Sequence, residues 1–254
     1  INIERSRDAS DLTNTKSFLN LNELVDSSEV IFISTGDDYI ANAGNELKEV
    51  LKNKKKIVGH LSGLHNSKVL KNIFPECPCF SLHPMYSFSG EQKDNSSLKD
   101  VVFTIEGDNE AVFKIREILE PVGNKILRIE PDSKALYHGA CVFASNYLTT
   151  ILEKSIKIFK DIGINENEAR VMLEPLVKGT VENTFKKGPE NSLTGPIARG
   201  DIQTISTHIN NLKKYDADIE NLYKVLGKET LNLATKKLLR DDEKINKIKI
   251  LLKE

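Results

Sequence analysis

The stretch Val30-Ile31-Phe32-Ile33-Ser34-Thr35-Gly36-Asp37-Asp38 decides the fold class of the chain. It begins with four apolar residues in a row and changes at once to small and acidic residues around Gly36. A strand buried on both faces has such a continuous apolar run, and strands of this kind are typical of parallel sheets covered by helices. We therefore expect a strand over 30–34, a turn at Gly36 and a helix over 39–51.

The same alternation continues outward from this stretch. A helical pattern covers 110–119, and short apolar runs predict further strands over 56–60, 79–82, 101–105 and 126–129. Strands that alternate with helices imply crossover connections and a parallel sheet. Toward the front, residues 1–4 have the pattern of a strand end and residues 9–19 that of a helix, which Asp8 is placed to cap.

After Pro131 the pattern becomes helical throughout. Apolar residues recur at helical spacing, and we expect helices over 136–163, 166–186, 201–212, 216–240 and 242–253. The prediction is thus an α/β fold. A parallel-sheet domain over residues 1–130 is followed by an all-helical domain over residues 131–254, which serves substrate binding and dimerisation.

The composition excludes several classes of partner. The 254 residues carry 36 Lys and Arg against 37 Asp and Glu, which argues against nucleic acid or an anionic membrane as the main partner. No apolar run is long enough to span a membrane, and no signal peptide is visible. The three cysteines form no disulfide framework, which favours reduced thiols and a cytoplasmic location.

Polar residues follow three of the predicted strands, and ligands of open parallel sheets bind beyond the carboxyl ends of strands. Two of these clusters contain a histidine, which can donate a proton or hydrogen-bond a carbonyl near neutral pH. Alternatively, His60 and His83 cap strand ends through backbone bonds. We assign substrate binding to His83, and cofactor binding to Thr35, Gly36, Asp37, His60 and Ser62. No acidic or cysteine partners stand at metal-ligand spacing, so we expect no metal.

The front of the chain carries Glu4-Arg5-Ser6-Arg7 at the end of a predicted strand. In a dinucleotide-binding sheet, arginine and serine at such a position bind the 2′-phosphate of NADP, whereas a glutamate binds the ribose hydroxyls of NAD. We assign cofactor binding to Arg5, Ser6 and Arg7 and expect NADP, with NAD as an alternative. An ordinary solvated charge cluster is the other alternative.

No Gly-x-Gly-x-x-Gly turn occurs in the chain. In dinucleotide-binding folds this turn lies between the first strand and helix, where the pyrophosphate meets the helix N-terminus. We expect that about 20 to 30 residues containing the turn precede Ile1 in the intact gene product. A truncated fold is the alternative, and it would put dinucleotide binding in doubt.

Two polar groups lie in the helical half. In Leu193-Thr194-Gly195-Pro196-Ile197-Ala198-Arg199-Gly200-Asp201 there are more turn and charged residues than a connecting loop needs. Asp201, Thr204 and His208 then share one helix face, although an N-cap role alone would explain Asp201. On the predicted 136–163 helix, His138 and Ser145 share a face with Asn146 at its edge. A buried Asn146 must satisfy its amide through a helix neighbour or a substrate.

These residues together resemble a known family: the Rossmann-like proteins whose C-terminal half is domain of unknown function 2520. The matching motifs are His60-Leu61-Ser62-Gly63, His83-Pro84-Met85, Ile105-Glu106-Gly107-Asp108, Tyr137-His138, Ala144-Ser145-Asn146, and the Leu193-to-Asp201 stretch with His208. The family is described as NADP-linked oxidoreductases, distantly similar to deazaflavin-dependent NADP reductases, pyrroline-5-carboxylate reductases and ketopantoate reductases. The resemblance implies a Rossmann-like fold and hydride transfer, and it names no substrate.

We therefore expect an NADP-dependent oxidoreductase acting on a small polar substrate, with its active site between the two domains. The catalytic residues would be His138 or His208 as proton group, Asn146 as anchor for a carbonyl or amine, and Arg199 as anchor for a carboxylate or phosphate. Further substrate-binding residues would be Ser145, Thr194, Asp201 and Thr204. Related helical domains carry a catalytic lysine four residues before the asparagine. This chain has Val142 there, so its acid must differ.

Two other functions stay open. The first is a non-catalytic protein that senses a nucleotide or metabolite, which would hold a cofactor without turnover. The second is an interaction scaffold on an inactive Rossmann fold, which would bind no nucleotide. For the assembly we expect a two-fold homodimer through residues after Glu130, because the helical half has more apolar face than a small bundle can bury.

Overall fold

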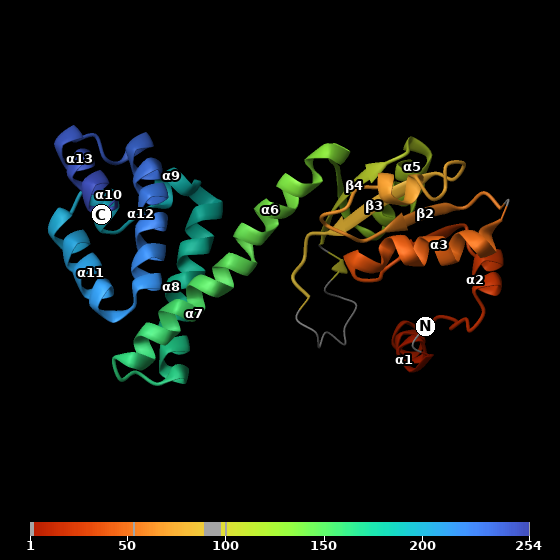
Figure 1. Cartoon of the computed structure of the whole chain (residues 1–254), viewed down its shortest axis with the longest axis horizontal. Coiled ribbons are helices and arrows are strands. Elements are labelled where there is room, and N and C mark those ends of the chain that lie inside the picture. The colour runs from red at the N-terminus through yellow and green to blue at the C-terminus, as the bar shows by residue number, and fades with distance from the viewer. Residues whose placement is uncertain (1–2, 53, 89–97, 100, 254) are drawn as a thin grey trace. The chain divides into compact units, whose positions relative to one another are not determined.

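The computed structural model describes residues 3–52, 54–88, 98–99 and 101–253 (Figure 1). The chain forms two compact units, Ile1–Leu148 and Thr149–Glu254, which we call the sheet unit and the helical unit. The helix α6 (Lys134–Ala144) therefore groups with the sheet. The division into functional domains at residue 130 stays a prediction.

The sheet unit contains a five-stranded sheet in the order β1-β2-β3-β4-β5 (Figure 1). The strands are β1 (Val30–Ile33), β2 (Ile57–His60), β3 (Cys79–Pro84), β4 (Val102–Gly107) and β5 (Lys125–Arg128). Each predicted strand from residue 30 onward is confirmed. The sheet is mixed, because β4 runs antiparallel to β3 while the other neighbouring pairs are parallel. An antiparallel neighbour needs no crossover helix, and apolar runs do not distinguish the two directions.

Helices cover both faces of this sheet. One face packs against α2 (Leu21–Ser27), α3 (Ile40–Leu51) and α4 (Lys68–Lys71), through a core that includes Val58 and Cys79. The other face packs against α5 (Asn109–Leu119), through Phe80, Ile105 and Ile115. Because successive residues of a strand point to opposite faces, Cys79 and Phe80 enter different cores. Short 3-10 turns connect the elements: η1 (Asp37–Tyr39), η3 (Glu120–Val122) and η4 (Pro131–Ser133).

The front of the chain differs from the prediction. Residues 1–2 lie outside the described part, and α1 (Ile3–Thr13) is a helix where a strand end was expected. The helix expected over 9–19 instead ends at Thr13, and Asn14 adopts a positive φ of 51°. Four residues are too few to define a strand by pattern alone, whereas the run from Glu4 through Ala9 contains good helix formers.

The helical unit has a core built by its last four helices. After α8 (Glu166–Lys187) and α9 (Pro189–Ser192) come α10 (Pro196–Arg199), α11 (Ile202–Tyr215), α12 (Ala217–Lys237) and α13 (Asp242–Leu251). Ile197, Ile205, Leu231 and Ile248, one from each of the last four, are buried together. Side-chain N-caps fix where helices begin, as the capping box of Asn165 and Glu168 does for α8. The predicted helices from residue 166 onward are thus confirmed within a few residues.

The helix expected over 136–163 is divided in two at Ser145. There α6 ends with Ser145 at φ −119° and ψ −70°, and α7 (Asn146–Asp161) begins at the next residue. Asn146 is therefore an exposed residue at the start of a helix, and the expectation that it is buried in mid-helix is wrong. Among the described helices, none is both long and apolar enough to cross a membrane.

Candidate functional site

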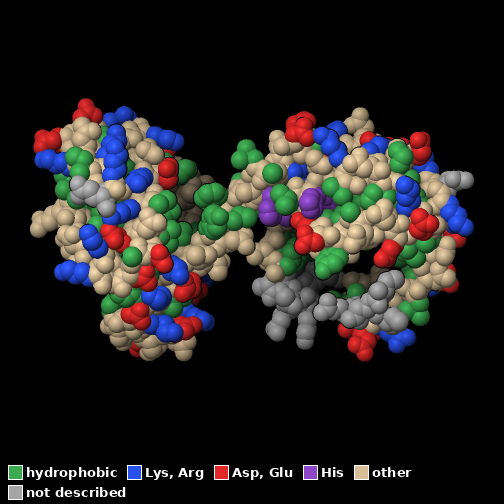
Figure 2. Space-filling view, viewed as in Figure 1, with side chains coloured by type: hydrophobic (Ala, Val, Ile, Leu, Met, Phe, Trp, Pro, Cys, Tyr) green, Lys and Arg blue, Asp and Glu red, His purple; other side chains and the backbone are tan. Residues whose placement is uncertain are grey.

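A cavity of about 370 Å³ lies in the sheet unit, between the chain that leaves β3 and the second half of α6. Its volume falls in the range of small-molecule sites. It brings together four predicted site residues, His83, His138, Ser145 and Asn146. The remaining lining residues are Met85, Tyr86, Ser87, Cys141, Val142 and Ala144. Figure 2 shows histidine side chains at the surface of this unit.

His83 is the most constrained polar group of the cavity. Its Nδ1 lies 2.7 Å from the Tyr137 hydroxyl, and its ring stands edge-on to the rings of Tyr137 and His138. Burial, reinforced by the nearby Lys134 and His138, lowers the pKa of His83 from 6.5 to about 4. The imidazole is therefore neutral at physiological pH.

Gly63, in the loop after β2, packs closely against the two histidines, where no side chain fits. A Cβ atom at this position would lie 2.7 Å from His138 Cδ2 and 2.9 Å from His83 Nε2. Any side chain here would push the rings apart or fill the space that they border. The weak His-x-Ser-Gly motif of the sequence thus contains one residue with a clear steric role at the cavity.

Lys134, which the sequence analysis did not assign, is buried behind these rings with 2% of its surface exposed. Its Nζ donates hydrogen bonds of 2.6 Å to the Ser62 carbonyl and to Ser81 Oγ, so it joins the loop after β2 and strand β3 to α6. Burial lowers its pKa from 10.5 to about 8, opposed by Glu106 and Asp37. Nothing in the sequence pattern separates this lysine from the many that are exposed.

Tyr137 belongs to one of the family motifs, and the sequence predicts no role for it. Its hydroxyl contacts His83 Nδ1 and, at 2.7 Å, Met85 Sδ, which also lies 3.5 Å from Cys141 Sγ. Burial raises the pKa of Tyr137 to about 12. The sequence around Tyr137 contains no pattern that predicts a hydrogen bond to a strand residue. Only the tertiary structure reveals the pair of Tyr137 and His83.

His60 and Ser62 build the loop after β2. His60 is fully buried, its Nδ1 accepts from the Ser62 N–H at 3.2 Å, and its Nε2 pairs with the Asn66 carbonyl at 3.2 Å. Ser62 Oγ accepts hydrogen bonds from the N–H groups of Leu64 and His65. Neither ring nitrogen of His60 is free for a cofactor, and the geometry is that of the backbone-capping alternative.

The loop after β1 is open, in contrast. Thr35, Gly36 and Asp37 are all exposed, and η1 begins within this loop. Thr35 also borders a largely apolar cavity of about 590 Å³ beside β1, whose lining includes Phe32 and Tyr39. These three residues are accessible at the carboxyl end of a strand, as a cofactor-binding loop must be.

The basic cluster at the front does not occupy a strand end. Arg5, Ser6 and Arg7 lie in α1, where Ser6 Oγ is 2.8 Å from Ser17 Oγ and Arg7 is exposed. The side chain of Arg5 lies outside what the structure describes. The strand-end geometry on which their assignment to a 2′-phosphate was based is therefore wrong.

In the helical unit, the stretch from Leu193 to Asp201 forms a sharp connection around α10. Gly195 and Gly200 have positive φ angles of 94° and 67°, and the Asp201 N–H donates to the Pro196 carbonyl at 2.8 Å. Asp201 caps α11 by accepting from the Thr204 N–H and hydroxyl, which lowers its pKa. The N-cap alternative thus describes both Asp201 and Thr204.

Three other predicted residues of this unit are exposed: Thr194, Arg199 and His208. His208 Nδ1 lies 3.1 Å from the Tyr223 hydroxyl. The side chain of Arg199 is exposed, and its charge helps to lower the pKa of Asp201. These residues and those of the 370 Å³ cavity belong to different units, and their assignment to one site stays a prediction.

Comparison with known proteins gives the family. Residues 101–230, more than half of the chain, match the family model Domain of unknown function (DUF2520). The chain belongs to the DUF2520 family. No curated protein matches it.

Solved structures share the fold of this chain. Protein TM1727 from Thermotoga maritima is 27% identical with a TM-score of 0.74, over 92% of this chain and 88% of that chain. The candidate NADP oxidoreductase BF3122 from Bacteroides fragilis is 20% identical with a TM-score of 0.70, over 90% of this chain and 85% of that chain. The pyrroline carboxylate reductase of Plasmodium falciparum, solved with NADP bound, is 16% identical with a TM-score of 0.54, over 93% and 82%.

The DUF2520 match includes α6 with Lys134 and Tyr137, and also the Leu193-to-Asp201 stretch.

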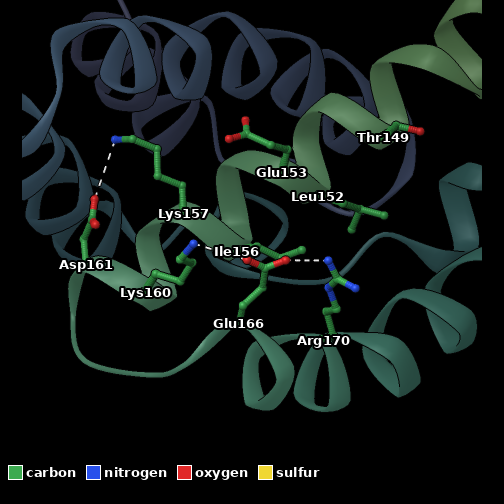
Figure 3. A pocket seen from close by; sticks show the side chains of 9 residues that line it. All are labelled: Thr149, Leu152, Glu153, Ile156, Lys157, Lys160, Asp161, Glu166 and Arg170. Carbon is green, nitrogen blue, oxygen red and sulfur yellow. Dashed lines mark hydrogen bonds and ion pairs between the residues drawn. The ribbon is translucent and has the colours of Figure 1, made fainter.

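A third cavity, of about 500 Å³, lies between α7 and α8 of the helical unit (Figure 3). There Glu166 sits between Lys160 and Arg170, and Lys157 pairs with Asp161 (Figure 3). Its charged groups neutralise one another, so it lacks the convergent unpaired groups of a binding site.

Proposed function

We propose that this protein is an NADP-dependent oxidoreductase that transfers a hydride to or from a small polar substrate. The observation that carries the proposal is the 370 Å³ cavity at the end of β3, where His83, His138 and Asn146 face the same space. Ligands of such sheets bind beyond the carboxyl ends of the strands. The oxidoreductase names of the structural neighbours support the reaction class.

The cofactor would supply the hydride when bound. The exposed loop of Thr35, Gly36 and Asp37 fits one part of a dinucleotide, since its backbone and side chains are accessible at the end of β1. His83 and His138 would orient the substrate, and Asn146 would hydrogen-bond its carbonyl or amine group. Arg199 would bind an anionic group of the substrate.

The choice of NADP over NAD rests on the cofactor named for the neighbours, because the basic cluster in α1 no longer supports it. Calorimetry of the full-length protein with NADPH and NADH tests this choice. We expect NADPH to bind at least about tenfold more tightly, a difference of about 1.4 kcal/mol. Equal affinities would leave the cofactor choice without support.

Turnover tests the proposal itself. The full-length protein is mixed with NADPH and a panel of small carbonyl and imine compounds, and the loss of nicotinamide absorbance is followed. We expect at least one compound to be reduced, and His138→Ala to slow that reaction without weakening NADPH binding. His65→Ala, outside the cavity lining, is the matched control. Absence of both NADPH and NADH binding would overturn the proposal.

One observation favours the non-catalytic sensor instead. A general acid or base works best with a pKa near the operating pH, whereas the pKa of His83 is about 4 and that of Tyr137 about 12. Neither group exchanges protons readily near neutrality. Tight NADPH binding without reduction of any compound in the panel would support this second function.

A further inference from the structure

The hydroxyl of Tyr137 has one proton and two acceptors within reach. His83 Nδ1 and Met85 Sδ each lie 2.7 Å from its oxygen. A thioether sulfur is a weak acceptor, whereas the unprotonated nitrogen of a neutral imidazole is a strong one. The proton of Tyr137 therefore goes to His83 whenever Nδ1 carries none.

The surroundings of His83 keep its ring neutral. The charged and titratable groups that face it are Lys134, Tyr137 and His138 from α6 and Asp37 from the loop after β1. Burial and the Lys134 ammonium oppose a second proton on the ring more strongly than Asp37 favours it. A neutral imidazole has a single N–H, and if Nδ1 accepts from Tyr137 that N–H must be on Nε2.

A second buried hydroxyl supports the same arrangement. Thr104 lies directly across from His83 in the β3–β4 register, and its Oγ1 is buried without a hydrogen-bond partner of normal geometry. It is close enough to Tyr137 to act against the rise in the pKa of that phenol. A small shift that brings Thr104 Oγ1 into hydrogen-bond geometry would let it donate to the Tyr137 oxygen, and the Tyr137 proton would then be left for His83.

The other nitrogen of His83 has no hydrogen-bond partner within the described residues, and the His83 side chain lines the 370 Å³ cavity. On one side Nε2 packs closely against Gly63, where a Cβ would lie only 2.9 Å away. His83 therefore offers a neutral N–H donor to the cavity that it lines.

We propose that Tyr137 is the positioning residue of His83 and holds its ring in the Nε2–H tautomer. The cavity then receives ligands that place a hydrogen-bond acceptor, such as a carbonyl oxygen or an imine nitrogen, against Nε2. This inference rests on the proposed function and narrows its substrate class. A fixed N–H donor stabilises negative charge that develops on such an atom as a hydride is added to its carbon, at no cost of reorganisation.

Nitrogen NMR of the imidazole rings in the full-length protein tests the tautomer. We expect His83 to show a protonated Nε2 and an unprotonated, hydrogen-bonded Nδ1 at pH 7. Tyr137→Phe should make the second tautomer detectable, while Tyr147→Phe, an exposed control, should change nothing. A proton on Nδ1 of the wild-type ring would overturn the proposal, even if Tyr137→Phe does not fold.

NADPH binding on the same proteins separates this inference from the proposed function. Tyr137→Phe should bind NADPH within about twofold of wild type and lower kcat for a reduced carbonyl compound about tenfold, with KM little changed. If the wild-type protein binds no NADPH, the proposed function fails whatever the tautomer. If NADPH binds but Tyr137→Phe leaves both the tautomer and kcat unchanged, only this inference fails.

Discussion

The ammonium of Lys134 is buried among oxygen acceptors, and its charge acts on the histidine in front of it. Two short hydrogen bonds, to the Ser62 carbonyl and Ser81 Oγ, compensate for part of the lost hydration. At the distance of His83 the charge still lowers the pKa of the ring. After burial, the charge of Lys134 is the largest influence that keeps this cavity residue neutral.

Lys134→Met should raise the pKa of His83 from about 4 toward 6.5, because the neighbouring positive charge is removed while the burial remains. A pH titration of the His83 ring by NMR measures the shift. Lys68→Met, which removes an exposed lysine, is the control and should leave the His83 pKa unchanged. A titration curve of His83 that is the same in both variants would contradict the electrostatic role of Lys134.

Arg199→Ala should abolish ligand binding and change stability by less than about 0.5 kcal/mol, because the side chain is exposed. Calorimetry and thermal unfolding of one variant measure both effects. If Arg199 instead pins the loop, the melting temperature falls clearly while affinity is retained, and that outcome would end the assignment of Arg199 to the ligand.

At the scale of elements, the loop after β2 carries an acid-sensitive group. Burial lowers the pKa of His60 from 6.5 to about 4, so the folded protein keeps this ring neutral where the unfolded chain takes up a proton. Between pH 6.5 and 4 the unfolded state therefore binds more protons, and stability falls as the pH falls. The slope for one such histidine is at most about 1.4 kcal/mol per pH unit.

Urea unfolding at pH 7 and at pH 5 should show this loss. His83 contributes in the same direction, since its pKa is also lowered. His60→Gln should reduce the difference in stability between the two pH values. Equal stability of the wild-type protein at both pH values would refute the buried neutral state.

The connection between α10 and α11 depends on Gly200. Its φ of 67° is unfavourable for other residues, and a Cβ would lie 2.9 Å from both Leu239 Cδ1 and Lys244 Cδ. Gly200→Ala should therefore destabilise the protein by about 1–3 kcal/mol in urea unfolding. Gly179→Ala, inside α8 with nothing within 4 Å of the new Cβ, should stabilise it by about 0.5–1 kcal/mol. A similar effect of both substitutions would show that the Gly200 backbone is not constrained.

At the scale of the whole molecule, the first helices of the helical unit leave apolar surface uncovered. No residue of α7 is buried, and Ala169 is the one buried residue of α8. Yet α8 carries Val171, Leu176 and Phe185, the last with 87% of its surface exposed. Figure 2 shows such apolar side chains among charges of both signs. An apolar helix face that its own chain leaves uncovered is typical of a protein–protein interface.

We propose that a two-fold homodimer forms through residues after Glu130 and covers this face, burying more than roughly 2,000 Å² in total. Light scattering at micromolar concentration should give twice the mass of one chain. Phe185→Glu should produce monomers, whereas Lys213→Glu, at an exposed polar position of α11, should not. A wild-type monomer would rule the dimer out.

The sequence by itself determined the secondary-structure plan and the family. Continuous apolar runs such as Val30–Ile33 predict strands, and β1 forms there. Its burial on both faces was not confirmed, because Phe32 keeps 42% of its surface exposed while Ile31 and Ile33 are buried. Motifs that share one stretch of chain, such as the Leu193-to-Asp201 turn, also identify the family without knowledge of the fold. Apolar runs and contiguous motifs depend only on residues that are neighbours in the sequence, so the sequence alone is enough to detect them.

The tertiary structure alone decided the direction of β4, the break at Ser145 and the polar network of the cavity. Tyr137 meets His83, and Lys134 meets Ser62 and Ser81, across 53 to 72 positions of the chain. Hydrogen bonds between such distant residues leave no periodic pattern. The neutral state of His83 likewise comes from burial and a neighbouring charge, which exist only when the chain is folded.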